Sequence, residues 1–259
     1  MPQIKNEEEI EGVIFQEYED IELPSPSYLI VGFPDAGLVG GISISHLIRE
    51  LNPTEVGGID IPRLNPPVVF VRDGEAKPPI KIFRKDGVLI VASEIPIVPA
   101  AIQMFSYALL EYAMRRRIDF IVGITGLGTP DRINKEKPQV YAAFSGDKMK
   151  KMIGDKNIQL FTEGAILGPF AIFLKESRRF RLNSVVLLAE TFPELPDPEA
   201  ASVAVEALSK LIGTKINIEK LLEEAEFIRL RNKELMKQTA RMMSQTGKSV
   251  EAQPSMLYT

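Results

Sequence analysis

Three short apolar runs constrain the fold of this 259-residue chain most. The runs at 27–33, 119–125 and 184–189 are almost entirely apolar, and Pro, Gly or polar residues stand near their ends. Runs of this length and composition are typical of strands that helices cover on both faces. The sequence therefore predicts a buried, mostly parallel sheet.

Helical segments alternate with these runs. Apolar residues recur at helical spacing after the first run, and Pro99, Pro169 and Asn217 suit the first turn or the N-cap of later helices. We expect helices at 36–51, 99–117, 169–180, 199–212 and from Asn217 onward. We expect strands at 55–61, 67–71, 80–83 and 88–92, with a hairpin turn at Lys85-Asp86-Gly87. This βα alternation predicts an α/β fold.

The chain changes character towards both ends. The predicted units are an α/β core domain at 1–213, a C-terminal helix at 214–244 and a flexible tail at 245–259 with linker composition. The core begins with an acidic segment, which we expect to be a solvated, strand-like edge or else a contact surface. Its acids are Glu7, Glu8, Glu9, Glu11, Glu17, Glu19, Asp20 and Glu22.

Composition excludes several classes of function. The net charge of −4 and the pI near 5.4 argue against nucleic-acid binding, and the absence of cysteine excludes disulfides and thiol chemistry. The chain has no apolar run long enough to cross a membrane, and its acidic N-terminus is unlike a signal peptide. We expect a cytoplasmic protein.

The segment after the first strand is unusually rich in glycine for a helix. Asp35 is expected to cap it, and Gly37, Gly40 and Gly41 each cost about 1 kcal/mol of helix propensity relative to Ala. Close packing against a neighbouring strand or against another subunit would compensate. We therefore consider these glycines as a possible oligomer interface.

Residues suited to catalysis are scarce. His46 is the sole histidine and lies in the glycine-rich helix, where a packed imidazole is the simpler interpretation. The stretch 123–128 follows a strand, but Pro130 and Asp131 stand where a phosphate-binding helix would begin. We expect no enzyme activity, no cofactor and no metal site.

Three segments together resemble a known family. The segments 32–40 (GFPDAGLVG), 123–128 (GITGLG) and 188–201 (LAETFPELPDPEAA) resemble, in order and spacing, the landmarks of the proteasome assembly chaperone 2 family, particularly its archaeal members. The resemblance implies a fold like that of purine nucleoside phosphorylases, an α/β/α sandwich around a mixed sheet. It also implies an enzyme-like scaffold that binds proteins and forms homo-oligomers, with a paralogue as a possible partner.

The C-terminus carries a second resemblance. Leu257-Tyr258-Thr259 is similar to the hydrophobic–tyrosine–any-residue ending by which proteasome activators and assembly factors dock between α subunits of the core particle. Upstream, Ile228 and Leu235 lie on an imperfect heptad seam, which indicates either docking on the chain's own domain or contact with another subunit. The sequence thus predicts an ATP-independent assembly chaperone or activator. The alternatives are an adaptor for another protein and a nucleoside phosphorylase-like or hydrolase-like enzyme.

Overall fold

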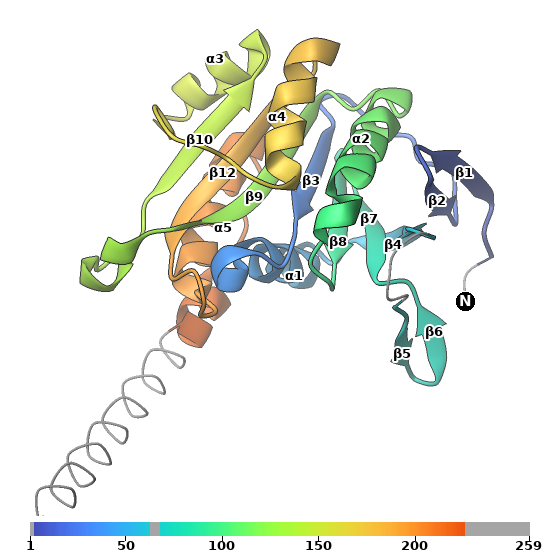
Figure 1. Ribbon diagram of the computed structural model, residues 1–259, viewed down its shortest axis with the longest axis horizontal. Coiled ribbons are helices and arrows are strands. Elements are labelled where there is room, and N and C mark those ends of the chain that lie inside the picture. The colour runs from blue at the N-terminus through green and yellow to red at the C-terminus, as the bar shows by residue number, and fades with distance from the viewer. Residues whose placement is uncertain (1–2, 63–67, 226–259) are drawn as a thin grey trace, which may run out of the picture.

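The core of the protein is one large mixed sheet. The computed structural model describes residues 3–62 and 68–225, and ten of its strands are paired in the order β1-β2-β4-β7-β8-β3-β9-β12-β10-β11 (Figure 1). Their bounds are β1 Asn6–Ile10, β2 Val13–Glu17, β3 Tyr28–Gly32, β4 Thr54–Asp60, β7 Ile80–Lys85, β8 Val88–Ser93, β9 Phe120–Gly128, β10 Val140–Ser145, β11 Gln159–Leu160 and β12 Asn183–Thr191. No helix of the described residues is long and apolar enough to cross a membrane.

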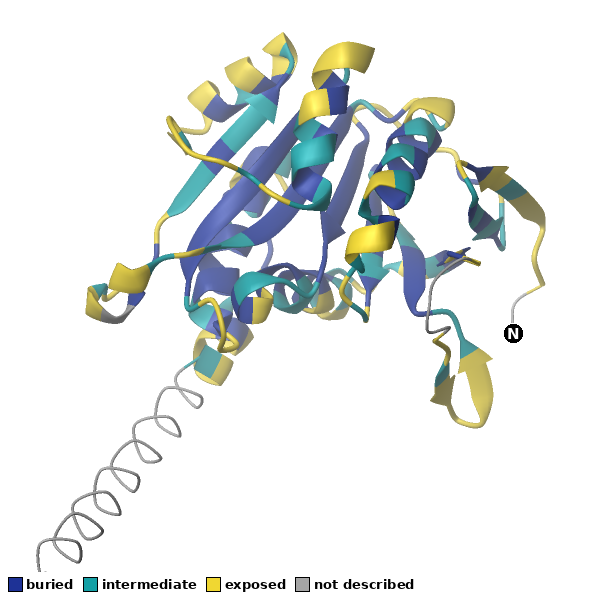
Figure 2. Cartoon of the chain, in the orientation of Figure 1, coloured by how far each residue is buried: buried dark blue, intermediate teal, exposed yellow. Residues whose placement is uncertain are grey.

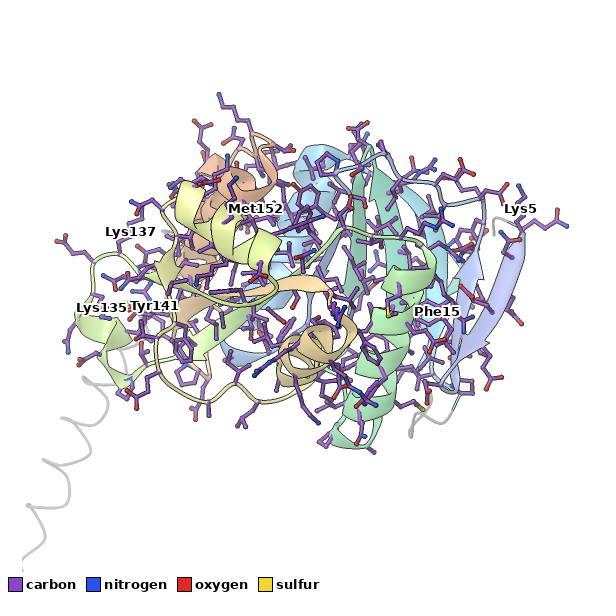
Figure 3. All side chains as sticks on the ribbon, turned by 90° about the horizontal axis from the view of Figure 1, so that it is seen from above. Lys5, Phe15, Lys135, Lys137, Tyr141 and Met152 are labelled. Atoms are coloured by element: carbon purple, nitrogen blue, oxygen red, sulfur yellow. The ribbon has the colours of Figure 1, made fainter. Side chains whose placement is uncertain are left out.

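Helices cover both faces of this sheet. The helices α2 (Pro99–Arg115) and α4 (Pro169–Phe180) pack on one face, and α1 (Val39–Leu51), α3 (Asp147–Asp155) and α5 (Pro198–Ile212) pack on the other (Figure 3). Each face has its own cluster of buried apolar residues, and the strands between them are buried (Figure 2). The predicted α/β/α sandwich is confirmed.

The apolar runs form the centre of the sheet. Strands β8, β3, β9 and β12 are neighbours and run parallel, whereas β1, β2, β4 and β7 form an antiparallel extension and β10 pairs antiparallel with β12. Every residue of β3 is buried. Continuous hydrophobicity thus predicted the central strands correctly, because each lies between two layers of helices.

The acidic N-terminal segment is a hairpin of which one strand lies inside the sheet. The edge strand β1 is largely exposed, but Val13, Phe15 and Glu17 of β2 are buried. The Phe15 ring stacks on Tyr112 of α2 with 4.4 Å between the centroids, and the Tyr112 hydroxyl donates a 2.6 Å hydrogen bond to Glu17. The expected solvated edge therefore describes β1 alone.

Two parts of the chain differ from the expectation. The strand expected at 67–71 is displaced, since β5 comprises Phe70–Arg72 and pairs only with β6 (Glu75–Lys77) in a small separate sheet. Val69 and Val71 are exposed there, so these β-branched residues do not mark a buried strand. The elements β10, α3 and β11 were not anticipated. The β10 sequence (VYAAFS) has a single β-branched residue, α3 is polar and rich in lysine, and β11 has only two residues.

The close approach of α1 to the sheet accounts for Gly40 but not for Gly41. A Cβ at Gly40 would lie 2.5 Å from the Phe33 carbonyl oxygen and 2.8 Å from that of Ile124, so α1 approaches β3 and β9 more closely than any other residue allows. At Gly41 a Cβ would make ordinary contacts of 3.7 Å with Pro34. An interface role is not needed to account for Gly40.

Gly40 and Gly41 give a matched pair of substitutions. We expect Gly40→Ala to destabilise the fold by about 1–3 kcal/mol, because the added methyl group overlaps two backbone carbonyls. Gly41→Ala should instead stabilise it by about 0.5–1 kcal/mol through higher helix propensity. Denaturant unfolding measures both values, and equal effects would contradict this account of helix–strand packing.

Candidate functional site

Three loops meet at the carboxyl ends of β3, β9 and β12, where α/β folds usually bind their ligands. They are the turn after β3, the loop after β9 and the segment that joins β12 to α5 (Figure 1). The three family-like segments of the sequence lie here, 32–40 in and around the turn after β3, 123–128 in the last residues of β9, and 188–201 from the end of β12 to the start of α5. The structure therefore brings together segments that are about 90 and 70 residues apart in the chain.

Gly37 is the point at which two of these loops join. Its N–H donates to the Pro193 carbonyl at 3.3 Å, and its own carbonyl accepts from the Asp197 N–H at 2.9 Å. The residue is left-handed, with φ of 63°, and a Cβ would lie 1.9 Å from the Thr191 hydroxyl oxygen. Only glycine fits here, because both the backbone conformation and the close approach exclude a side chain.

Asp35 joins the first loop to β9, and it stands at the predicted N-cap position without a capping hydrogen bond from its side chain. It stands before the short 3₁₀ turn Ala36–Leu38, but its side chain makes no capping bond; it accepts a hydrogen bond from the Thr125 hydroxyl instead. Burial raises the pKa of Asp35 to about 7, although the Thr125 hydroxyl and the backbone N–H groups of Gly40 and Gly126 favour the charged form. Asp35 is thus poised to change charge near neutral pH.

A buried arginine fixes the loops after β9 and β12. Arg132 is only 3% exposed and donates to both carboxylate oxygens of Asp197, at 3.0 and 3.3 Å, and to Glu199 at 2.7 Å. Its guanidinium also lies over the Phe192 ring, 5.0 Å from the centroid. Asp197 in turn caps α5 by accepting from the Ala200 N–H at 3.0 Å. Bidentate pairing of this kind fixes geometry as well as adding energy.

This frame presents two leucines to solvent. Leu38 is 41% exposed and is held in the left-handed conformation, with φ of 52°. Leu195, in the loop between Pro193 and Asp197, is 48% exposed. A left-handed leucine costs about 1–3 kcal/mol, and surrounding contacts must hold it in place. The carboxyl edge therefore combines hydrogen-bonded loops with two exposed apolar side chains.

His46 and Glu190 do not form a catalytic group at this edge. His46 is buried between α1 and the start of the last helix, where its Nε2 lies 2.6 Å from the Asn217 carbonyl oxygen. Glu190 is near the edge but is bound by Lys135 and by the Gln139 N–H. Among the described residues no group of three or more His, Asp or Glu side chains could hold a metal ion.

The predicted binding residues fall into two groups. Gly37 and Gly40 are buried against this chain's own backbone, and Gly41 lies beside Pro34. Ile228, Leu235, Leu257, Tyr258 and Thr259 lie outside the described residues. The described start of the last helix packs on the core, since Leu221 is fully buried and Asn217 accepts from the Glu219 N–H as the predicted N-cap.

Comparison with protein families decides the relationship. The model of the PAC2 family matches residues 29–236, which include all three loops of the carboxyl edge. The chain belongs to the PAC2 family. Among curated relatives, the uncharacterized protein MJ0106 of Methanocaldococcus jannaschii is 27% identical over 243 residues, covering 92% of this chain and 97% of the relative.

Solved structures of PAC2 proteins share the fold. PbaA of Pyrococcus furiosus, described as an archaeal homolog of proteasome-assembly chaperone, is 27% identical with a TM-score of 0.75, over 90% of this chain and 97% of that chain. PbaB of the same organism, described as an archaeal proteasome activator, has a TM-score of 0.77 at 19% identity, over 88% of this chain and 100% of that chain. The resemblance seen in the sequence is confirmed.

The titration of Asp35 gives a prediction for stability. A carboxyl group whose pKa is higher in the folded than in the unfolded state stabilises the fold at low pH, and this contribution is lost as pH rises towards the folded value. Its folded pKa is about 7 and an unfolded Asp titrates near 4, so the loss should fall between about pH 4 and 7. Thermal unfolding of Asp35→Asn should lack this part of the pH dependence.

Asp86→Asn provides the matched control. Asp86 is exposed in the left-handed position of the β7–β8 turn, a conformation that Asn also adopts. The unfolding temperature of Asp86→Asn should depend on pH as that of the wild type does. A wild-type profile for Asp35→Asn as well would show that the Asp35 carboxyl does not titrate in this range.

Proposed function

We propose that this chain is a proteasome-binding assembly chaperone or activator. The observation that carries the proposal is membership of the PAC2 family together with 27% identity to PbaA along nearly the whole chain. PbaA is described as a homolog of proteasome-assembly chaperone, and PbaB, whose likeness concerns the fold, as a proteasome activator. The partner would be the core particle, in the cytoplasm.

A binding scaffold without enzyme activity suits the carboxyl edge of the sheet. In α/β enzymes a ligand occupies the crevice beyond the carboxyl ends of the strands. Here the loop 193–197 is tied to Gly37 through backbone hydrogen bonds, and Arg132 holds Asp197 beneath it. The exposed side chains of this edge include the apolar Leu38 and Leu195 as well as Glu194. These features support a surface for protein contact that works without ATP hydrolysis.

The C-terminal residues are the proposed docking element. In Leu257-Tyr258-Thr259, leucine and the tyrosine ring supply apolar area, the phenol hydroxyl supplies a hydrogen bond, and the terminal carboxylate can pair with a cation. Pockets between α subunits of the core particle are the proposed receptors. This assignment rests on the sequence, since these residues lie outside the described part of the chain.

Several copies would bind far better than one. Ordering a single short tail costs conformational entropy, so one tail alone should bind weakly. Linking several tails in a homo-oligomer, or in a complex with a paralogue, can raise the overall affinity by about 100-fold or more when the geometry permits simultaneous binding. A homo-oligomer is therefore part of the proposal.

Removal of the tyrosine ring should abolish binding without affecting the fold. Surface plasmon resonance on immobilised core particle would compare the wild type with Tyr258→Ala and with a chain lacking Leu257-Tyr258-Thr259. Both should lose at least about tenfold in affinity, because each change removes the Tyr258 contact from every copy in the oligomer. Ser255→Ala, in the same tail, is the control and should bind as the wild type does. Undiminished binding by the truncated chain would refute tail docking.

The terminal carboxylate can be tested separately. A synthetic peptide of the last residues should compete with the whole chain for the core particle, and its C-terminally amidated form should compete less well, because amidation removes the charge that pairs with a pocket cation. Equal competition by the two peptides would show that no such ion pair forms.

A further inference from the structure

The sole histidine of the chain attaches its last described segment, residues 214–225, to α1. The His46 ring is fully buried, and its Nε2 lies 2.6 Å from the carbonyl oxygen of Asn217. A carbonyl oxygen can only accept, so Nε2 carries the proton and donates this hydrogen bond. Asn217 is the N-cap of the last helix, because its side chain accepts from the Glu219 N–H at 2.9 Å. His46 therefore holds the point at which that helix begins.

The other nitrogen of the ring has no partner. Nδ1 of His46 is buried and makes no hydrogen bond with a described residue. Ser43, one turn earlier on α1, is also fully buried, and its hydroxyl makes no bond to the ring. A protonated ring would place a positive charge and a second N–H donor here, and burial without a bonded acceptor disfavours both. Burial of the ring and uptake of a proton by the ring therefore oppose each other.

The elements packed around α1 supply no charged group that bonds to His46. The strands β3, β8 and β9, which α1 contacts, contain no charged residue. Asp35, before α1, is bonded to the N–H of Gly40 instead. The charged residues of α5 are all in ion pairs, Glu199 with Arg132 and Glu206 with Lys210. Within the described chain, these elements offer no bonded counter-charge for a protonated ring.

The ion pairs that join α1 to the segment lie nearer the surface. They are Arg49–Glu224, at 2.9 Å, and Lys220–Glu50, at 3.4 Å, and the further charged residues of the segment are the exposed Lys215, Glu219 and Glu223. Exposed ion pairs contribute little and weaken with salt. Ile216 and Leu221 are buried in the same apolar cluster as Leu47 of α1. The segment is therefore held mainly by this packing and by the buried bond from His46.

We propose that protonation of His46 releases residues 214–225 from α1, so that acidification loosens the attachment of the C-terminal part of the chain to the core. In the attached state the neutral ring is buried and donates to Asn217. In the released state the ring can reach water, where an imidazole takes up a proton below about pH 6.5. Release that is coupled to the uptake of one proton becomes up to about tenfold more favourable for each pH unit below that value.

The consequence concerns the direction of the chain beyond the core. Residues 214–225 connect α5, which packs beside α1, with residues 226–259 (Figure 1). While Asn217 is bonded to His46, the start of the last helix has a fixed position on the core. Release would remove this constraint. The proposal holds whether or not the C-terminus docks into another protein.

Amide hydrogen exchange of the full-length chain, between about pH 5.5 and 7.5, measures this release. Protection factors, which correct for the intrinsic effect of pH on exchange, should fall for the amides of 218–225 by up to about tenfold per pH unit below about pH 6.5. The protection of β3 and β9 should not fall with them, because the sheet stays folded when only the segment opens. Constant protection of 218–225, or an equal fall in the strands, would overturn the proposal.

Two variants separate the ring from the rest of the contact. H46Q keeps an N–H donor for the Asn217 carbonyl but cannot be protonated, so its protection of 218–225 should not depend on pH in this range. R49Q is the matched control, because it removes the surface pair with Glu224 on the same helix and should keep the wild-type dependence. D35N, which removes a carboxyl group whose pKa is about 7, should keep it too. Wild-type behaviour of H46Q, or loss of the dependence in either control, would contradict the assignment to His46.

Nuclear magnetic resonance tests the same proposal without a substitution. The chain has one histidine, so the ring gives one set of signals. At about pH 7.5 the nitrogen chemical shifts should show the proton on Nε2. The ring should then become protonated over the pH range in which 218–225 loses protection. A proton on Nδ1 at neutral pH, or a protonated ring while 218–225 remains protected, would show that His46 does not control the segment.

Discussion

The close approach of the turn after β3 to its neighbours is the constraint on which the carboxyl edge depends. A Cβ at Gly126 would lie 2.1 Å from the Ala36 carbonyl oxygen, and the corresponding distance from Gly37 to the Thr191 hydroxyl is 1.9 Å. These contacts need glycine on both sides of the junction. They also fix the start of α1, because Gly37 and Leu38 are both left-handed immediately before its first turn. The direction of α1 and the position of the loop before α5 thus both depend on the contacts around Gly37.

This junction explains how an enzyme-like sheet comes to present a surface. In a parallel α/β fold the carboxyl edge is normally left open, and polar side chains converge there on a ligand. Here Arg132 and Asp197 are both 3% exposed and are bonded to each other, so the polar groups at this edge stabilise the loops. Leu38 follows Gly37, whose N–H and carbonyl bond to Pro193 and Asp197. Local strain that a structure maintains often marks a functional position.

The sequence was sufficient for the centre of the fold but not for its ends. The runs at 27–33, 119–125 and 184–189 predicted β3, β9 and β12 because burial on both faces leaves a continuous apolar signal. The edge strand β1 (NEEEI) is polar along most of its length, and β10 (VYAAFS) has a single β-branched residue, so neither gives such a signal. The sequence predicted that Asp35 caps a helix, because local spacing cannot show that the Thr125 hydroxyl, 90 residues away, donates a hydrogen bond to its carboxylate. Order and spacing of the glycine segments revealed the family, but their convergence at one edge required the structure.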